Sequence, residues 1–335
     1  MSGTQITAEI DFDAPGKHTG YLRVPHSVHT SAYGWIPVPV VSINNGEGPT
    51  LVMLAGVHGD EYEAQIALSR LAQDLVPEQL RGRVILLPMT NLPAAQAGLR
   101  TSPIDNGNLN RTFPGDPTGT PTAMIADYLE NALLPMADYL VDLHSGGTSL
   151  YYPPTLLRGR GVSPEEADKL RLLQDAFDLP YAWVFTSGGG QTSAARTAMG
   201  AGNRNGVVSI MAELGGGGAV TPDILKMTER GLRRILHVLG MLPGYQPDAA
   251  RGTRELHAQG SVYAYHSGLF EPLNDIGDTV VQGETIGLVH HPETPLQAPD
   301  AIASPYEGIV LCKRALAPIA RGDAAFQIAR DAEPA

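Results

Sequence analysis

Two histidines and a nearby glutamate occupy positions from which they could bind a metal ion. Residues 58–61 read HGDE and follow a strongly apolar run, while residues 142–147, DLHSGG, close another apolar run far downstream. Together they offer two imidazoles and one carboxylate, the kind of ligand set that leaves zinc one open position for water. The chemistry that such a site would perform is the activation of water for hydrolysis.

The expected strands bring these side chains to one edge of a sheet. His58 lies just past one predicted strand, and His144 and Glu213 lie at the ends of two others. Ligands of open parallel sheets gather outside the carboxyl ends of the strands, so the three side chains should share one rim. Glu61 follows His58 by three residues, which places it at the mouth of a helix within reach of the same ion.

Each of these residues also has a purely structural interpretation. A His-x-x-Glu pair is common by chance, and His144 could be a buried histidine whose hydrogen bonds are satisfied. Glu213 could cap or pair locally. The pattern alone leaves both interpretations open, although the convergence of the polar groups on strand ends favours a metal site.

A second polar cluster combines Arg100 with residues 108–115, NLNRTFPG. Arginine recognises carboxylates through a planar, two-pronged edge, so Arg100, Asn110 and Arg111 could hold the anionic end of a small substrate. Alternatively, Arg111 pairs with an acid of the scaffold while Asn110 holds a turn. The residue types do not decide between the two.

The chain around these residues alternates between apolar runs of strand length and segments with helical spacing. This alternation predicts an α/β fold with a mostly parallel sheet, covered by helices on both faces, over residues 46–245. The predicted strands are residues 50–56, 84–88, 139–143 and 207–214, and the predicted helices are residues 61–75, 122–134, 170–177 and 222–239.

The two ends of the chain read differently. Residues 1–45 contain short apolar segments between Pro and Gly, and we expect them to form strands that pack on the catalytic part. Residues 246–335 lose helical periodicity and show short apolar runs separated by regular turn signals, which predicts a small all-β domain.

Composition narrows the class of protein. The chain has 335 residues, of which 43% are hydrophobic and 17% charged, values typical of a soluble globular protein. A net charge of −12 without a basic block argues against nucleic-acid binding. Cys312 is the only cysteine, which excludes an intramolecular disulfide and a Cys-based zinc site. No signal peptide or membrane-spanning stretch is evident, so we expect a cytoplasmic protein.

Four motifs in order make the chain resemble a known family. Residues 56–61 (GVHGDE), 108–115 (NLNRTFPG), 142–144 (DLH) and 213–215 (ELG) are similar to motifs of the succinylglutamate desuccinylase/aspartoacylase family, a branch of the zinc carboxypeptidase superfamily. The resemblance extends from about residue 30 through the C-terminal β segment and so covers most of the chain. It implies a zinc-carboxypeptidase-like fold and one zinc ion per chain.

The resemblance also implies roles for single residues. His58, Glu61 and His144 would ligate zinc, and Glu213 would be the general base. Asn110 and Arg111 match a substrate-binding pair, with Arg111 contacting a carboxylate or the polarised carbonyl, and Arg100 matches a further substrate-binding arginine.

The pattern departs from true aspartoacylases in the HSGG of residues 144–147 and in the glycine run 215–218. Within the family it is more similar to the bacterial N-α-acetyl-L-2,4-diaminobutyrate deacetylases of ectoine degradation. The expected substrate is therefore a small N-acyl amino acid. The alternatives are another deacylase, such as a desuccinylase or aspartoacylase, a metallocarboxypeptidase, or a zinc-free scaffold or carrier protein.

Several other features receive a simpler interpretation. His290 and His291 are expected in a solvated loop rather than a second metal site, and Asp60 is expected to support the histidine or the loop. Residues 188–190 are expected to form a loop near the site. The C-terminal segment should shape the entrance or mediate assembly, and we expect a homodimer.

Overall fold

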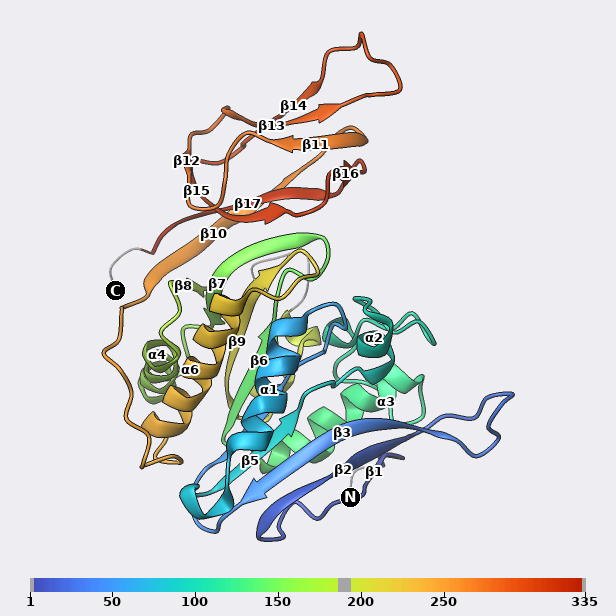
Figure 1. Cartoon of the computed structure of the whole chain (residues 1–335), viewed down its shortest axis with the longest axis vertical. Coiled ribbons are helices and arrows are strands. Elements are labelled where there is room, and N and C mark those ends of the chain that lie inside the picture. The colour runs from blue at the N-terminus through green and yellow to red at the C-terminus, as the bar shows by residue number, and fades with distance from the viewer. Residues whose placement is uncertain (1–2, 186–193, 333–335) are drawn as a thin grey trace.

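The computed structural model describes residues 3–185 and 194–332. In this part of the chain, thirteen strands form one twisted sheet that runs through the whole molecule (Figure 1). The central strands are mutually parallel: β5 (Arg83–Leu87), β4 (Thr50–Leu54), β6 (Tyr139–His144) and β9 (Val208–Gly216). The predicted site residues therefore lie at the edge of the sheet where these parallel strands end.

Antiparallel strands flank this centre on both sides. On one side lie β3 (Trp35–Asn44), β2 (Gly16–Pro25) and the short β1 (Thr7–Ala8). On the other side β7 (Leu150–Arg158) runs antiparallel to β9, and β8 (Tyr181–Val184) runs parallel to β7. Within residues 46–245 the described strands pair in parallel except for β7 with β9, so the prediction of a mostly parallel sheet holds for that range. The sheet as a whole is mixed because strands from outside this range extend it.

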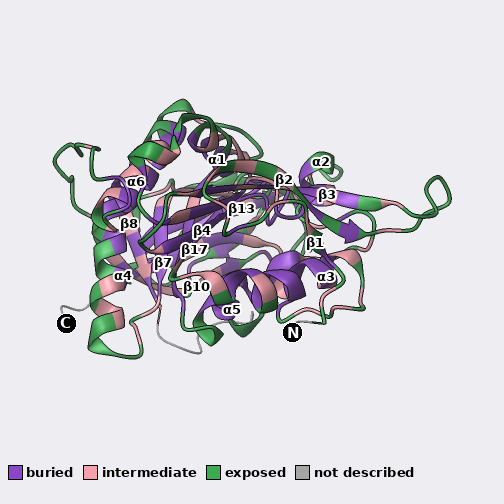
Figure 2. Cartoon of the chain, turned by 90° about the horizontal axis from the view of Figure 1, so that it is seen from below, coloured by how far each residue is buried: buried purple, intermediate pink, exposed green. Residues whose placement is uncertain are grey.

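Helices cover both faces of the sheet, as predicted. One face packs against α1 (Tyr62–Asp74), α4 (Pro164–Phe177) and α6 (Pro222–Val238). The other packs against α2 (Leu92–Ala97), α3 (Pro121–Tyr128) and α5 (Ala198–Arg204). Figure 2 shows the consequence: buried residues fill the sheet and the inner helix faces, and exposed residues lie on the outer faces. The buried face of α1 carries Ala64, Ala67, Leu68 and Leu71, which have helical spacing.

The sequence missed strands β7 and β8 and the short helices α2 and α5. β7 contains Pro153 and Pro154, which weaken a strand prediction because proline cannot donate to the ladder. The structure accommodates them at an irregularity in the β7–β9 register between Tyr152 and Thr155. The predicted helix at residues 122–134 is correct in place, but after Tyr128 it continues as a π-helical turn, Leu129–Leu133, and a 3-10 turn, Leu134–Met136.

The C-terminal segment extends the main sheet and adds a second one. β10 (Arg254–Tyr263) pairs in parallel with β8 and leads to β17 (Ala324–Asp331), β15 (Gly308–Arg314) and β12 (Thr279–Val280). The second sheet contains β14 (Asp300–Ala303), β13 (Thr285–His290), β11 (Gly268–Pro272) and β16 (Pro318–Ile319). Phe270, Ile286 and Phe326 pack between the two sheets. Because β15 also pairs with β7, this segment adjoins the strands beside the site.

None of the described helices combines the length and the apolar character needed to cross a bilayer. The expected loop at residues 188–190 lies outside the described residues.

Candidate active site

A tight connection between β4 and α1 positions the first two site residues. β4 ends at Leu54, and Glu61 immediately precedes α1. Between them, Gly59 packs against α2 so closely that a Cβ atom would lie 2.0 Å from the carbonyl carbon of Ala94. Only glycine fits there, because any side chain would collide with the backbone of α2.

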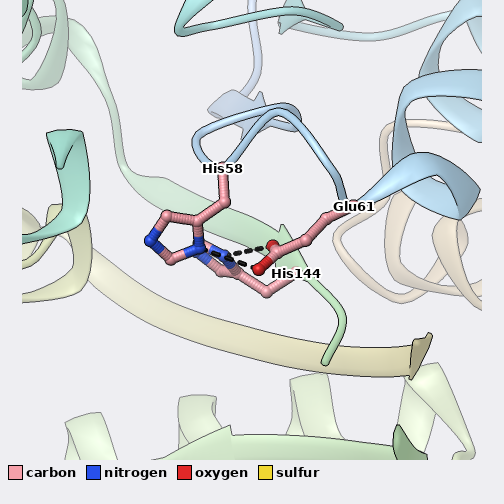
Figure 3. Close-up of side chains that lie close together, drawn as sticks. All are labelled: His58, Glu61 and His144. Carbon is pink, nitrogen blue, oxygen red and sulfur yellow. Dashed lines mark hydrogen bonds and ion pairs between the residues drawn. The ribbon is translucent and has the colours of Figure 1, made fainter. Parts of the chain in front are cut away.

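The carboxylate of Glu61 lies between the two predicted histidine ligands (Figure 3). Its Oε1 is 2.8 Å from Nδ1 of His58, and its Oε2 is 2.8 Å from Nδ1 of His144, the last residue of β6. All three residues are buried, and they offer ligand atoms that lie within 4.8 Å of one another. The structure thus brings together His58, Glu61 and His144 in a group that could hold one metal ion.

The electrostatics of the three groups differ. Burial disfavours the charged form of Glu61, but the adjacent His58 and His144 outweigh it and lower the pKa of the carboxyl. Burial lowers the pKa of His58 despite Glu61. Burial also disfavours the protonated form of His144, but the negative charges of Asp142 and Glu61 outweigh burial and raise the pKa of His144. Glu61 therefore stays anionic between the rings, as a metal ligand must.

Glu213 lies directly beside this group. It sits within β9, three residues before the end of the strand, opposite His144 in the parallel β6–β9 register. Its Oε2 is buried and has no hydrogen-bond partner among the described residues. Burial, aided by the negative charge of Glu61, raises the pKa of Glu213 to about 8. A cation bound beside Glu213 would lower this pKa and so oppose the effects of burial and of Glu61. The side chain would then be a carboxylate that can accept a proton.

Asn110 and Arg111 reach the same place from a 3-10 turn, Leu109–Arg111. The amide of Asn110 is buried; its Oδ1 accepts a hydrogen bond from the N–H of Ala198, and its Nδ2 lies 3.2 Å from Nε2 of His144. The Arg111 guanidinium donates to the Asn110 carbonyl at 2.6 Å. Burial, together with the charges of Arg100 and Arg196, lowers the pKa of Arg111.

Arg100 belongs to the rim of the site. Its Nη1 lies 3.6 Å from Oε1 of Glu61 and 3.4 Å from Nδ1 of His58, while 47% of its side chain is exposed. A guanidinium that is partly exposed to solvent can pair with an incoming anion.

The residues next to the ligands shape the backbone around them. Asp60 is not among the residues whose ligand atoms converge, and its Oδ2 accepts a hydrogen bond of 2.7 Å from the N–H of Thr148. It thereby supports the loop after His144, one of the two roles expected for it. Gly216 has φ near +146°, and a Cβ there would lie 2.1 Å from the carbonyl oxygen of Leu150. This glycine allows β9 and the loop to approach closely.

Four neighbouring residues were not predicted from the sequence. Asn108 and Asp142 contact the histidine rings, and Asp142 could have been found because side chains two apart in a strand share a face. Arg196 adds a charge near Arg111, and Tyr152 is influenced by the charge of Glu213. Tyr152 lies on β7, which the sequence analysis missed.

The catalytic-domain pattern of succinylglutamate desuccinylase/aspartoacylase matches residues 47–239, more than half of the chain. The chain belongs to this family. The family resemblance drawn from the four motifs is thereby confirmed.

Relatives of known identity extend the likeness to the whole chain. An N-α-acetyl-L-2,4-diaminobutyric acid deacetylase of Halomonas elongata is 39% identical over 98% of this chain and 96% of its own. The product-bound structure of an ectoine utilization protein from Ruegeria pomeroyi superimposes with a TM-score of 0.92 at 35% identity, over 98% of this chain and 100% of its own. A succinylglutamate desuccinylase/aspartoacylase from Rhodobacter sphaeroides gives 0.91 at 37% identity, over 99% and 100%. These likenesses support a hydrolase.

Proposed function

We propose that the protein is a zinc-dependent amidohydrolase that cleaves N-α-acetyl-L-2,4-diaminobutyrate into diaminobutyrate and acetate. The observation that carries the proposal is the placement of Glu213 opposite His144, beside a buried His-Glu-His group. The deacetylase that aligns with nearly the whole chain supports the choice of substrate.

The residues present fit a zinc ion. Nδ1 of His58, Nδ1 of His144 and the carboxylate of Glu61 converge on one point and supply nitrogen and oxygen ligands. A buried carboxylate among titratable rings is stabilised by a cation. When bound, zinc would supply Lewis acidity, making water more acidic and an amide carbonyl more electrophilic.

Glu213 would move the protons of the reaction. An unpartnered carboxylate oxygen in a buried place can accept a proton from the attacking water, whose oxygen then adds to the acyl carbon. As the C–N bond breaks, the same carboxyl group can return that proton to the departing amine nitrogen. The products are then a free amine and acetate.

The arginines would stabilise and orient the substrate. Arg111 is half-buried at the 3-10 turn and can donate hydrogen bonds to the negative charge that develops on the acyl oxygen. Arg100, on the exposed rim, can pair with the substrate α-carboxylate. Asn110, held by Ala198, would keep the turn and its arginine in place.

A substrate panel tests the proposal. The zinc-loaded protein is incubated with N-acetyldiaminobutyrate, N-acetylaspartate, N-succinylglutamate and a short peptide series, and amine release is measured. We expect the highest kcat/KM for N-acetyldiaminobutyrate. A preference for N-acetylaspartate or N-succinylglutamate would instead assign another deacylase, and a preference for peptides a carboxypeptidase. A protein that holds no stoichiometric zinc and hydrolyses none of them after metal reconstitution would be a scaffold or carrier.

A further inference from the structure

Strand β7 connects the site to the C-terminal segment (Figure 1). It pairs with β9, the strand that carries Glu213, and its first two residues also pair with β15 of the C-terminal segment. A side chain on this part of β7 can therefore contact both the site and the C-terminal strands.

Tyr152 is such a side chain. It stands opposite Gly215 in the β7–β9 register, and Glu213 precedes Gly215 by two residues. Diagonal neighbours of this kind on paired antiparallel strands lie about 7–8 Å apart, which is within reach of an aromatic side chain. Burial raises the pKa of Tyr152 well above its usual range, and the negative charge of Glu213 adds to this effect. Tyr152 is thus a neutral phenol beside the candidate base.

The C-terminal segment holds the far end of this ring. The hydroxyl of Tyr152 donates a hydrogen bond of 3.0 Å to Oε1 of Gln327, a residue of β17. Cys312 stands opposite Gln327 in the β15–β17 register and is buried, and burial raises the pKa of its thiol. The hydroxyl of Tyr152 therefore meets a neutral amide and a neutral thiol, and the amide oxygen of Gln327 fixes its direction.

Glu213 lacks a hydrogen bond that would fix its own direction. Its Oε2 is buried and has no partner among the described residues, so packing must hold the carboxylate in place. A general base works only within hydrogen-bond reach of the proton that it accepts. The ring of Tyr152 can supply this packing, because its backbone is fixed in β7 and its hydroxyl is fixed by Gln327.

We propose that Tyr152 is a positioning residue that packs beside Glu213 and holds its carboxylate toward the site, and that Gln327 keeps Tyr152 in place. The C-terminal segment then takes part in the reaction through one hydrogen bond, although the ligand atoms that converge in the described residues come from elsewhere. This inference rests on the proposed function, because it requires Glu213 to be the base.

Two substitutions that remove the same hydrogen bond test the proposal. Tyr152→Phe keeps the ring, and Gln327→Met keeps the length of the side chain but removes the acceptor. We expect each to lower kcat about three- to tenfold, the range that the loss of one neutral hydrogen bond gives. KM and zinc content should stay unchanged, because the arginines and the metal ligands are untouched. The double variant should be no slower than the slower single variant, since both residues act through one bond.

A matched control loosens the same strand away from the site. Asp331 is also on β17, and its carboxylate accepts hydrogen bonds of 2.6 and 2.9 Å from Arg254. Asp331→Asn should leave kcat and KM unchanged. An equal fall of kcat in Asp331→Asn would show that any loosening of the C-terminal segment slows the enzyme, and it would overturn the specific role of Gln327.

The kinetics are measured with the substrate of the panel that the zinc-loaded wild type cleaves fastest. A wild type that cleaves none of them would sink the proposed function. With an active wild type, values of kcat within twofold of it in Tyr152→Phe and Gln327→Met would overturn the positioning roles, and so would independent losses that multiply in the double variant. Should Gln327→Met fail to fold, an unchanged kcat in Tyr152→Phe would overturn them alone.

Discussion

Histidines meet carboxylates both at the sheet edge and in the C-terminal segment, and the two places are built differently. At the sheet edge, the side chains of His58, Glu61 and His144 are 4%, 2% and 2% exposed. In the C-terminal segment, Oδ2 of Asp300 lies 2.6 Å from Nε2 of His291 and 3.5 Å from Nδ1 of His266, yet the side chain of His266 is 57% exposed.

The contrast shows that residue type alone does not make a metal site. Exposed ion pairs are worth about 0–1 kcal/mol, because water already stabilises both partners. A buried group of the same residue types has lost the stabilisation by water, and a bound metal ion would supply stabilisation in its place. In the part of the chain that the structure describes, the group whose ligand atoms converge within 4.8 Å is the one at the sheet edge.

The largest effect should come from removing a ligand of the buried group. His144→Ala removes one of the two nitrogen donors and should reduce bound zinc from one ion per chain to almost none, with loss of all turnover. Elemental analysis after dialysis against zinc measures this. Unchanged zinc content would show that His144 is not a ligand.

A smaller but still large effect is expected at Glu213. Glu213→Gln keeps the size of the side chain and removes its ability to accept a proton, so the protein should retain zinc and lose about 10²–10⁴-fold in kcat. Initial rates with parallel zinc analysis check this. Near-normal turnover with full zinc would refute its role as the base.

Arg100 should contribute mainly to substrate binding. Because its side chain is 47% exposed, Arg100→Ala should raise KM about tenfold, the lower end of what loss of a charged hydrogen bond costs. The matched control is Arg23→Ala, since Arg23 is also half-exposed but pairs with Glu9 far from the site. Equal KM values for the two variants would remove Arg100 from the substrate-binding residues.

The smallest effect is expected in the C-terminal group. The side chain of His266 is 57% exposed. His266→Ala should therefore leave zinc content and turnover unchanged and alter the free energy of unfolding by no more than about 0.5 kcal/mol, as is usual for surface substitutions. Thermal and urea unfolding check the stability. A loss of bound zinc in this variant would contradict the contrast between the two places.

The sequence predicted the proximity of the candidate site residues better than it predicted the framework around them. His58 and His144 could be placed because the one follows and the other ends an apolar strand, and strand ends meet at one edge. Glu213 was expected at the end of its strand, but β9 continues to Gly216, and the register with β6 still places Glu213 opposite His144. Strand β7 was missed because Pro153 and Pro154 argue against a strand. In the structure they lie where the register between β7 and β9 is irregular. The antiparallel strands beside the parallel centre depend on long-range pairing, which local patterns do not report.

The same limit applies to the C-terminal residues. His290 was expected in a solvated loop, but it is the last residue of β13 and contacts Glu271, while His291 follows in the turn. Asp142 was visible in the sequence as a neighbour of His144, but its burial and its distance from Nε2 follow only from the packing of three strands.

The most direct test of the account is a zinc titration of the metal-stripped protein with N-α-acetyl-L-2,4-diaminobutyrate as substrate. The account predicts no acetate release without zinc, a rise in proportion to added zinc, and a plateau at one equivalent per chain. Equal activity with and without zinc, or no activity at full occupancy, would contradict it.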